Sequence, residues 1–261
     1  MVRLAVLADI HGNLPALEAT LKDIQRRGTP DVIWVLGDLV AFFPWLSDTI
    51  DRLRSLPDAS VIQGNTDRYL VTGQRHAIPV QSMDDWEYFS QRVALRDKCF
   101  QWMIEQLRYE DYAYLRDLPH YLELKPPGFG RVMGVHAVPG NDEVEIWPDT
   151  PDQEVQGYLE GEDMQLLVFG HTHTSMQRRI GNIQLVNPGG VGFAYRNKPE
   201  SYAAYALLEF SGSDCAVHLY QVDYDIDRVI KSLQQSSYPG AKGLLKIFHR
   251  STLDGSRKEI K

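Results

Sequence analysis

Seven residues in five short clusters carry carboxylate, amide or imidazole groups of the kind that bind divalent metals. Two are aspartates, one is an asparagine and four are histidines. That number of ligands can hold two divalent ions with one carboxylate shared between them. The pattern therefore predicts a two-metal hydrolase. The clusters are Asp9-Ile10-His11, Gly37-Asp38, Gly64-Asn65, His136 and Gly170-His171-Thr172-His173.

The ligand types narrow the choice of metal and of substrate. Asp9 and His11 are two residues apart, as are His171 and His173, so in an extended turn each pair can face one metal. Carboxylate and imidazole without thiolate favour transition metals over calcium, and we expect manganese, with iron, zinc, nickel or cobalt as alternatives. Two divalent cations against two carboxylates leave the site positive, which predicts an anionic substrate such as a phosphate ester.

Each cluster follows an apolar run that reads as a buried strand. In an open α/β sheet, ligands gather at the carboxyl ends of the strands, where the loops converge. The first three runs alternate with helical patterns, which predicts an α/β core containing parallel strands. The runs that precede the clusters are residues 4–8, 32–36, 61–62, 131–135 and 166–169.

The remaining pattern divides the chain into a core, an insertion and a tail. Asn13 can cap a helix that ends at Gly28. Residues 67–118 are helical and rich in aromatics, and we interpret them as a helical cap insertion within a single domain, residues 1–240. Hairpins are expected around residues 121–135, 176–186 and 202–222, followed by a helix over 225–235. Residues 241–261 carry excess lysine and arginine and are expected to form a loosely attached tail.

Composition excludes several classes of protein. The chain has 261 residues and a formal net charge of −8, which argues against a stable nucleic-acid complex because such binding rests on lysine and arginine. Nucleic acid could still be a substrate held by metals. No apolar run approaches the roughly 20 residues of a membrane span, and the short first run, broken by Asp9, does not read as a signal peptide. We expect a cytoplasmic protein without a membrane partner.

The ordered set DxH, GD, GN, H and GHxH resembles the calcineurin-like metallophosphoesterase family, in particular its small bacterial and archaeal phosphodiesterase-like members. The resemblance implies a four-layer α/β/β/α sandwich of two mixed sheets. It also implies hydrolysis of a phosphate ester by a hydroxide held between two metals, with Asp38, Asn65 and His136 as catalytic residues. By the same resemblance Asp9, His11 and His173 bind the first metal, Asn65, His136 and His171 bind the second, and Asp38 bridges them.

One position departs from the family pattern. In the phosphoprotein phosphatases of this family a histidine follows the motif asparagine and can protonate the leaving oxygen, whereas this chain has Thr66. A hydroxyl is a poor general acid near neutral pH. We therefore expect a diesterase-like enzyme that acts on phosphodiesters or small phosphomonoesters and turns over poor leaving groups slowly. Asp67 is retained but lacks the histidine that it would orient.

Several alternatives stay open at the level of sequence. Taken singly, each cluster could be structural, and only their combination indicates a metal site. Asn13 is a helix cap and a candidate phosphate contact, and Arg68 could hold a substrate phosphate or be a surface residue. The substrate could be a nucleotide. Rival functions are a phosphoprotein or dinucleoside polyphosphate phosphatase and a non-catalytic, metal-binding scaffold of the same fold. The sequence does not specify the oligomeric state.

Overall fold

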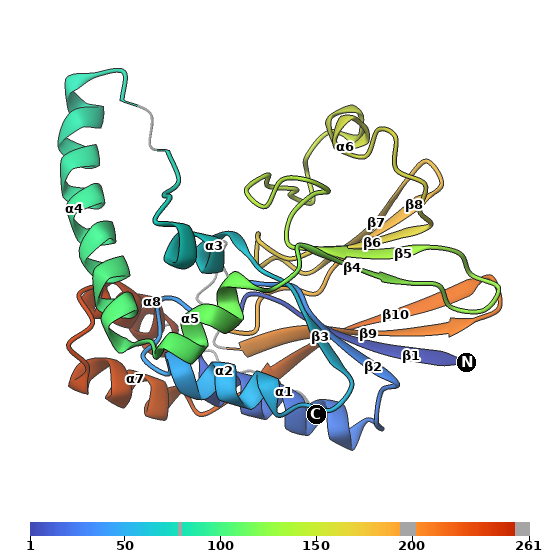
Figure 1. Ribbon diagram of the computed structural model, residues 1–261, viewed down its shortest axis with the longest axis horizontal. Helices are drawn as coiled ribbons and strands as arrows, with labels where there is room; N and C mark the ends of the chain where they lie inside the picture. Colours follow the sequence, from blue (N-terminus) through green and yellow to red (C-terminus); the bar gives the residue numbers. More distant parts are fainter. Residues whose placement is uncertain (78–79, 194–201, 254–261) are drawn as a thin grey trace.

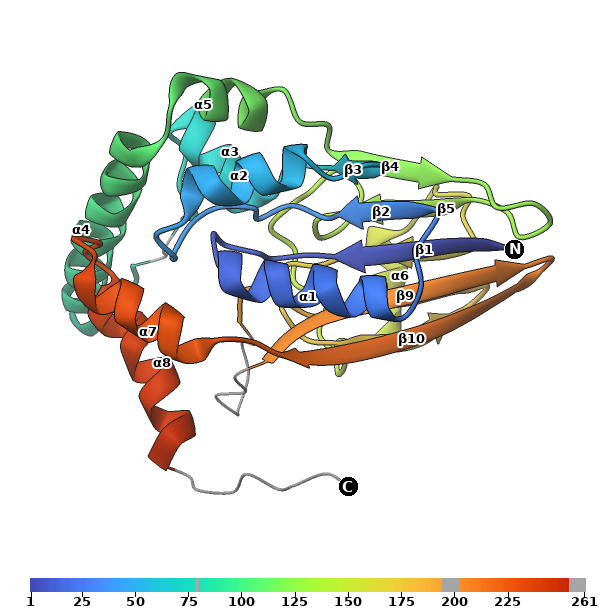
Figure 2. The same ribbon diagram turned by 90° about the horizontal axis from the view of Figure 1, so that it is seen from below.

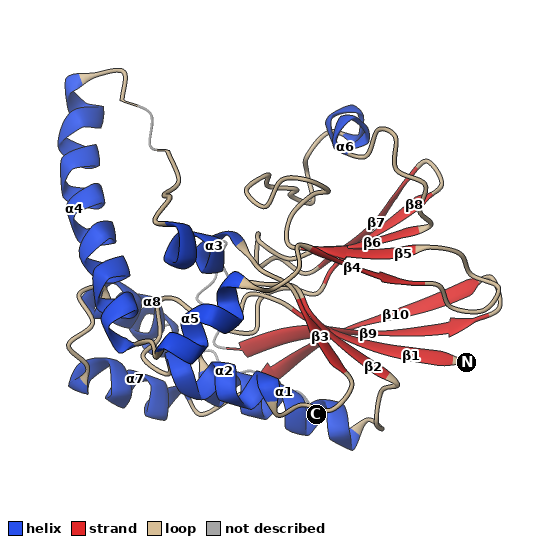
Figure 3. Cartoon of the chain, viewed as in Figure 1, coloured by secondary structure: helices blue, strands red, loops and turns tan. Residues whose placement is uncertain are grey.

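A computed structural model describes residues 1–77, 80–193 and 202–253. Two mixed five-stranded sheets face each other (Figures 1 and 3). In the first sheet, with strand order β10-β9-β1-β2-β3, the three strands β1, β2 and β3 are parallel, and β9 pairs antiparallel with β1. Its strands are β1 Val2–Leu7, β2 Val32–Val35, β3 Ala59–Val61, β9 Tyr202–Ser211 and β10 Asp214–Asp223.

The second sheet has the order β4-β5-β6-β8-β7. Strands β5, β6 and β8 are parallel, while β4 and β7 pair antiparallel with their neighbours. The three hairpins expected from the sequence are confirmed as the pairs β4–β5, β7–β8 and β9–β10. The strands are β4 Tyr121–Leu124, β5 Val132–Val135, β6 Leu166–Val168, β7 Met176–Ile180 and β8 Ile183–Asn187.

Helices cover the outer faces of both sheets, which confirms the four-layer α/β/β/α fold (Figures 1 and 2). Asn13 caps α1 by accepting a hydrogen bond from Ala16 N, as expected. Helix α6 covers the second sheet, and the remaining helices gather at the first. The helices are α1 Leu14–Arg26, α2 Leu46–Arg54, α3 Asn65–Thr72, α4 Met83–Gln106, α5 Tyr109–Arg116, α6 Asp152–Tyr158, α7 Ile226–Gln235 and α8 Ala241–Leu253.

Three apolar clusters hold these layers together. The central cluster lies between the sheets and joins residues such as Val6 and Trp34 of the first sheet to Val168 of the second. Strands β1 and β2 are covered on both faces, which explains why their sequences are almost continuously apolar. The outer clusters join each sheet to its helices. Because the parallel strands of both sheets are fixed by these clusters, the loops at their carboxyl ends are held on rigid supports.

Residues 67–118 include most of α3 and all of α4 and α5, and their role as a cap inserted in a single domain stays a prediction. Buried residues of α4 and α5, including Phe100 and Leu115, join the cluster on the outer side of the first sheet. The expected loose tail is wrong for residues 241–253, which form α8. Leu244 and Phe248, four residues apart, are buried in the same cluster, so their apolar contacts attach the helix firmly. Residues 254–261 lie outside the described residues.

Among the described residues, none of the helices combines the length and the apolar character that crossing a bilayer would require.

Candidate metal centre

The seven predicted ligands lie together at the carboxyl ends of the strands, in loops from both sheets. Five of them have left-handed backbone conformations, which for a residue with a Cβ atom cost about 1–2 kcal/mol each. Strain of this kind concentrates at functional sites, where the surrounding structure enforces it. Sharp turns after the strands therefore aim these side chains at one place. The five residues, with φ between 52° and 67°, are Asp9, His11, Asp38, His171 and His173.

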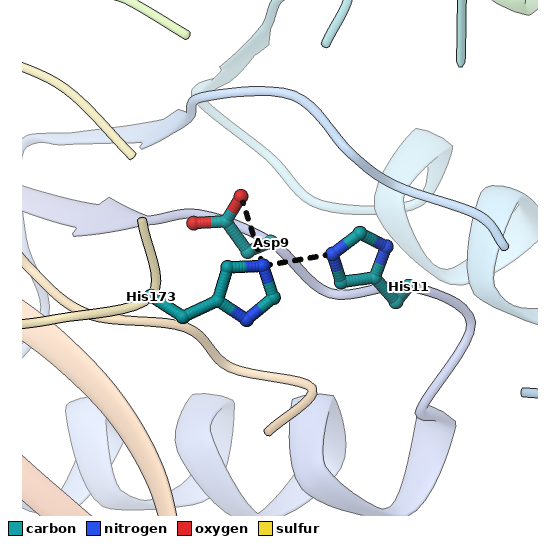
Figure 4. A group of neighbouring side chains, drawn as sticks. All are labelled: Asp9, His11 and His173. Carbon is teal, nitrogen blue, oxygen red and sulfur yellow. Dashed lines mark hydrogen bonds and ion pairs between the residues drawn. The ribbon is translucent and has the colours of Figure 1, made fainter. Parts of the chain in front are cut away.

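Asp9, His11 and His173 form the first group of donors (Figure 4). His11 Nε2 lies 3.0 Å from His173 Nε2, and His173 Nε2 lies 3.7 Å from Asp9 Oδ1. All three side chains are buried. Donor atoms that each lie about 2.0–2.2 Å from one ion are separated from each other by distances like the 3.0 and 3.7 Å found here. This group therefore has the spacing of a metal site.

Asn65, His136 and His171 form the second group. His136 Nε2 is 2.9 Å from Asn65 Oδ1 and 3.2 Å from His171 Nδ1. The three residues come from the start of α3, the end of β5 and the loop after β6. The sequence places them 35 or more residues apart, and the meeting of the two sheets brings them together.

Asp38 lies between the two groups. Its Oδ2 is 3.6 Å from His11 Nε2, and its Oδ1 is 3.5 Å from His136 Nε2. One carboxylate oxygen thus faces each group, an arrangement that suits a ligand shared by two ions. The backbone N–H of Thr66 donates to Oδ1 at 2.9 Å and fixes the orientation of the carboxylate.

Backbone carbonyls orient two of the imidazoles. His136 Nδ1 lies 2.7 Å from the carbonyl oxygen of Leu36, and His173 Nδ1 lies 2.8 Å from that of Phe193. Because a carbonyl can only accept, each Nδ1 carries the proton and each Nε2 presents a lone pair to the site. Metal-binding histidines are commonly positioned by partners of this kind.

Asp67 anchors the loop that carries Asp38, a role that sequence reasoning missed. Its fully buried carboxylate accepts hydrogen bonds from the backbone N–H groups of Leu39, Val40 and Gly64 at 3.0–3.3 Å. These bonds tie the loop after β2 to the turn before α3. A signal existed, because an acidic residue at the third position of a helix often bonds back to the residue before the helix.

Burial sets the protonation of the site. It lowers the pKa of the His11 and His171 imidazoles to about 4 and that of His173 well below its usual value. Burial, together with the charge of Asp38, raises the pKa of Asp9 well above its usual value. For Asp38 itself, burial is outweighed by the neighbouring imidazoles, which lower its pKa to about 2. Neutral imidazoles beside an ionised carboxylate are the state that metal binding requires.

The residues present fit divalent metals. Asp9 Oδ2 is buried and has no hydrogen-bond partner. Leaving such an oxygen unpaired costs about 1–3 kcal/mol or more. The buried carboxylates of Asp9 and Asp38 also repel each other. A bound cation would relieve both costs. The donor set contains only oxygen and nitrogen, which suits manganese, iron, zinc, nickel or cobalt.

The two predicted substrate contacts have other partners in the structure. Asn13 is fully buried, caps α1, and donates from Nδ2 to the Gly192 carbonyl at 2.7 Å. Arg68 makes a bidentate ion pair with Asp142 at 2.7 and 2.8 Å and bonds Glu143 at 2.5 Å. The structure therefore supports the capping role of Asn13, and contact of either residue with substrate stays a prediction.

Two further features involve residues close to the predicted ligands. His76 Nδ1 lies 2.9 Å from Glu143 Oε2, which joins it to the Arg68 ion pairs. The rings of Phe42 and Phe193 pack on His11, with centroids 4.7 and 5.4 Å from the imidazole. The acidic pair 142–143 and the aromatics carry no sequence pattern that links them to the site.

The seven carboxylate, amide and imidazole donors thus meet between two facing mixed sheets. Residues 2–212 match the model of the calcineurin-like phosphoesterase superfamily domain, and the chain belongs to that family. It is 29% identical over 256 residues to an uncharacterised protein of Methanocaldococcus jannaschii, a match that covers 90% of this chain and 93% of the relative. A hypothetical protein of Pyrococcus horikoshii shares the fold with a TM-score of 0.77 and 25% identity, covering 96% of this chain and 99% of that one.

A shorter similarity involves proteins named for a nucleotide substrate. The chain is 34% identical over 67 residues to the symmetrical bis(5'-nucleosyl)-tetraphosphatase of Psychromonas ingrahamii. The match covers 25% of this chain and 24% of the relative. It therefore shows a shared segment and not a shared architecture over the whole length.

Proposed function

We propose that this protein is a binuclear-metal phosphoesterase that hydrolyses phosphodiester or small phosphomonoester bonds. The position of Asp38 carries the proposal, since one of its oxygens faces the first group of donors and the other faces the second. Membership of the phosphoesterase superfamily supports the reaction class. Two divalent transition ions, with manganese as the expected metal, would supply an activated water and stabilise negative charge on the phosphoryl group.

The chain's own residues hold and orient the reacting groups. Asp9, His11 and His173 would hold the first ion, and Asn65, His136 and His171 the second. Asp38 would contact both. The catalytic residues are then Asp38, Asn65 and His136, whose donor atoms meet at 2.9 and 3.5 Å where the two groups join. Burial lowers the pKa of the His11, His171 and His173 imidazoles and keeps them neutral, and it excludes water that would weaken these contacts.

Thr66 supports the preference for diesters and good leaving groups. Its hydroxyl donates to the carbonyl of Val40 at 3.2 Å, and its backbone N–H is bonded to Asp38. A hydroxyl held in this way does not protonate a leaving oxygen near neutral pH. We propose His76 as a candidate to replace the missing acid, because Glu143 joins it to Arg68, which lies three residues after Asn65. We also propose that Arg68 and Asn13 contact the substrate.

A nucleotide substrate is the second candidate. The segment shared with a bis(5'-nucleosyl)-tetraphosphatase favours a dinucleoside polyphosphate, and the partly exposed ring of Phe42 beside His11 offers a surface on which a base can stack. A metal-binding scaffold without turnover is the rival from another class. It is disfavoured because all seven donors are present and oriented.

Activity of the metal-loaded protein separates these functions. The protein is stripped with a chelator, reloaded with Mn²⁺, and assayed on a diaryl phosphodiester, an aryl phosphomonoester, a phosphopeptide and a dinucleoside tetraphosphate. We expect the diester to be hydrolysed fastest and the phosphopeptide slowest. A faster reaction on the tetraphosphate would favour the second candidate. Metal binding without hydrolysis of any substrate would support the scaffold and refute the enzyme.

A further inference from the structure

Helix α4 is anchored at one end only. Its C-terminal half packs on the core through Cys99, Phe100 and Met103, and Trp102 Nε1 donates to Ser237 Oγ at 2.9 Å. The N-terminal half extends beyond both sheets (Figure 1). Residues 83–88 are all exposed. About half of this 24-residue helix therefore lacks the tertiary contacts that normally stabilise a helix in water.

The free half carries an apolar stripe. Trp86, Phe89 and Val93 are spaced by three and four residues and share one face of the helix, which continues to the buried Phe100. Trp86 is 53% exposed and stacks on Phe89 with centroids 5.8 Å apart. Phe89 and Val93 are half-buried. The same apolar face of α4 is buried against the core at the C-terminal end and exposed at the N-terminal end. An exposed apolar patch of this kind is typical of a protein–protein contact.

The charges beside this stripe fit a second copy of the same helix. Asp85 lies one turn before Phe89 and Arg92 almost one turn after it, both exposed. When two α4 helices lie antiparallel and cross near Phe89, Asp85 of each copy comes opposite Arg92 of the other, and Trp86 comes opposite Val93. A parallel pair would instead place the acidic first turns, with Asp84 and Asp85, against each other.

We propose that two copies of this chain form a symmetric dimer through the N-terminal halves of their α4 helices, packed antiparallel. The same patch serves on both subunits, as a two-fold interface requires. Because the contact spans only about three helical turns, it lies at the small end of protein interfaces, and the dimer dissociates on dilution. The proposal is independent of the phosphoesterase function, because α4 residues 83–93 supply none of the predicted ligands.

The first experiment measures the mass of the full chain by sedimentation as a function of concentration. The wild type is expected as a dimer, and the variant Trp86→Ser/Phe89→Ser as a monomer whose dimer dissociation constant is at least ~30-fold higher. Leu95→Ser is the matched control, because Leu95 is 47% exposed and lies on the side of the helix away from the stripe. Circular dichroism of each variant checks that the fold is intact.

The second experiment tests the antiparallel register. Asp85→Lys and Arg92→Glu should each weaken the dimer, since each places like charges opposite each other at both ends. An equimolar mixture of the two variants should restore it, because both contacts become attractive. Asp85 also bonds the Gln81 N–H near the helix start, but loss of that bond would not be rescued by mixing.

Three results would overturn the proposal. One is a wild-type chain that sediments as a monomer up to about 100 µM, well above the micromolar range expected for a specific contact. Another is a dimer that persists in Trp86→Ser/Phe89→Ser. The last is a mixture of charge variants that dissociates as each variant does alone, which would exclude the antiparallel pairing.

Discussion

Replacement of Asp38 by asparagine tests the shared ligand most directly. The amide keeps the shape of the side chain and can still accept the Thr66 N–H, which is 2.9 Å from Oδ1. The stability of the metal-free fold should therefore change by less than about 1 kcal/mol. The charge that faces both groups of donors is lost. The substituted amide would be neutral and present one oxygen in place of two, so it would hold two cations much less tightly.

The expected loss can be estimated from binding linkage. At a metal concentration of 100 times the dissociation constant, each ion stabilises the fold by about 2.7 kcal/mol, or about 5 kcal/mol for two. Loss of a direct ligand should weaken each ion at least ~100-fold, the upper end of the effect seen for supporting residues. The stabilisation then falls to about 0.4 kcal/mol per ion. At about 2–4 °C per kcal/mol, the metal-induced rise in melting temperature drops from roughly 10–20 °C to about 2–3 °C.

The assay is thermal denaturation of the stripped protein with and without Mn²⁺, together with hydrolysis of a diester. Activity should fall on the order of 10³-fold, equivalent to about 4 kcal/mol of transition-state stabilisation. Asp117→Asn is the control, because it makes the same chemical change at a surface carboxylate paired with Arg116. A variant Asp38→Asn that retains the full metal-induced shift and full activity would refute the shared-ligand role.

Three further predictions concern the frame around the site. Asp58→Gly should raise the free energy of unfolding by about 0.5–1 kcal/mol in urea denaturation, because Asp58 is exposed with φ 55°; a lower midpoint would contradict this. Asp67→Asn should lower the free energy of unfolding by about 1–3 kcal/mol, because the NH₂ group of the asparagine would face the Gly64 N–H. It should also weaken metal binding ~10–100-fold in a calorimetric titration. Unchanged metal affinity would show that the anchor is dispensable. Hydrogen bonds from His76 and Arg68 outweigh burial and lower the pKa of Glu143 to about 2. The free energy of folding that the ionised Glu143 contributes is therefore complete above pH 4.5 and is lost as pH falls toward 2. Glu143→Gln should remove that acid-induced loss, which solvent exposure limits to under about 1 kcal/mol, and an identical pH profile would argue against the interaction.

Local pattern predicted much of the fold because the elements that carry the site are also the most regular ones. The apolar runs before Asp9 and Asp38 are strands buried on both faces, and the turn residues between later runs mark hairpins. The sequence failed at α8. The excess of lysine and arginine over residues 241–261 indicated a loose tail, whereas Leu244 and Phe248 are buried against the helical layer and hold the helix there.

The sequence by itself determined which donors the site contains, since their chemical types and their positions after strands are local properties. Only the tertiary structure decided how they act together. The Leu36 carbonyl orients His136 from 100 residues away, and Asp67 fixes the loop of Asp38. Burial between two sheets keeps the imidazoles of His11, His171 and His173 neutral. Orientation, burial and charge depend on contacts between distant segments, and no local pattern of residues contains that information.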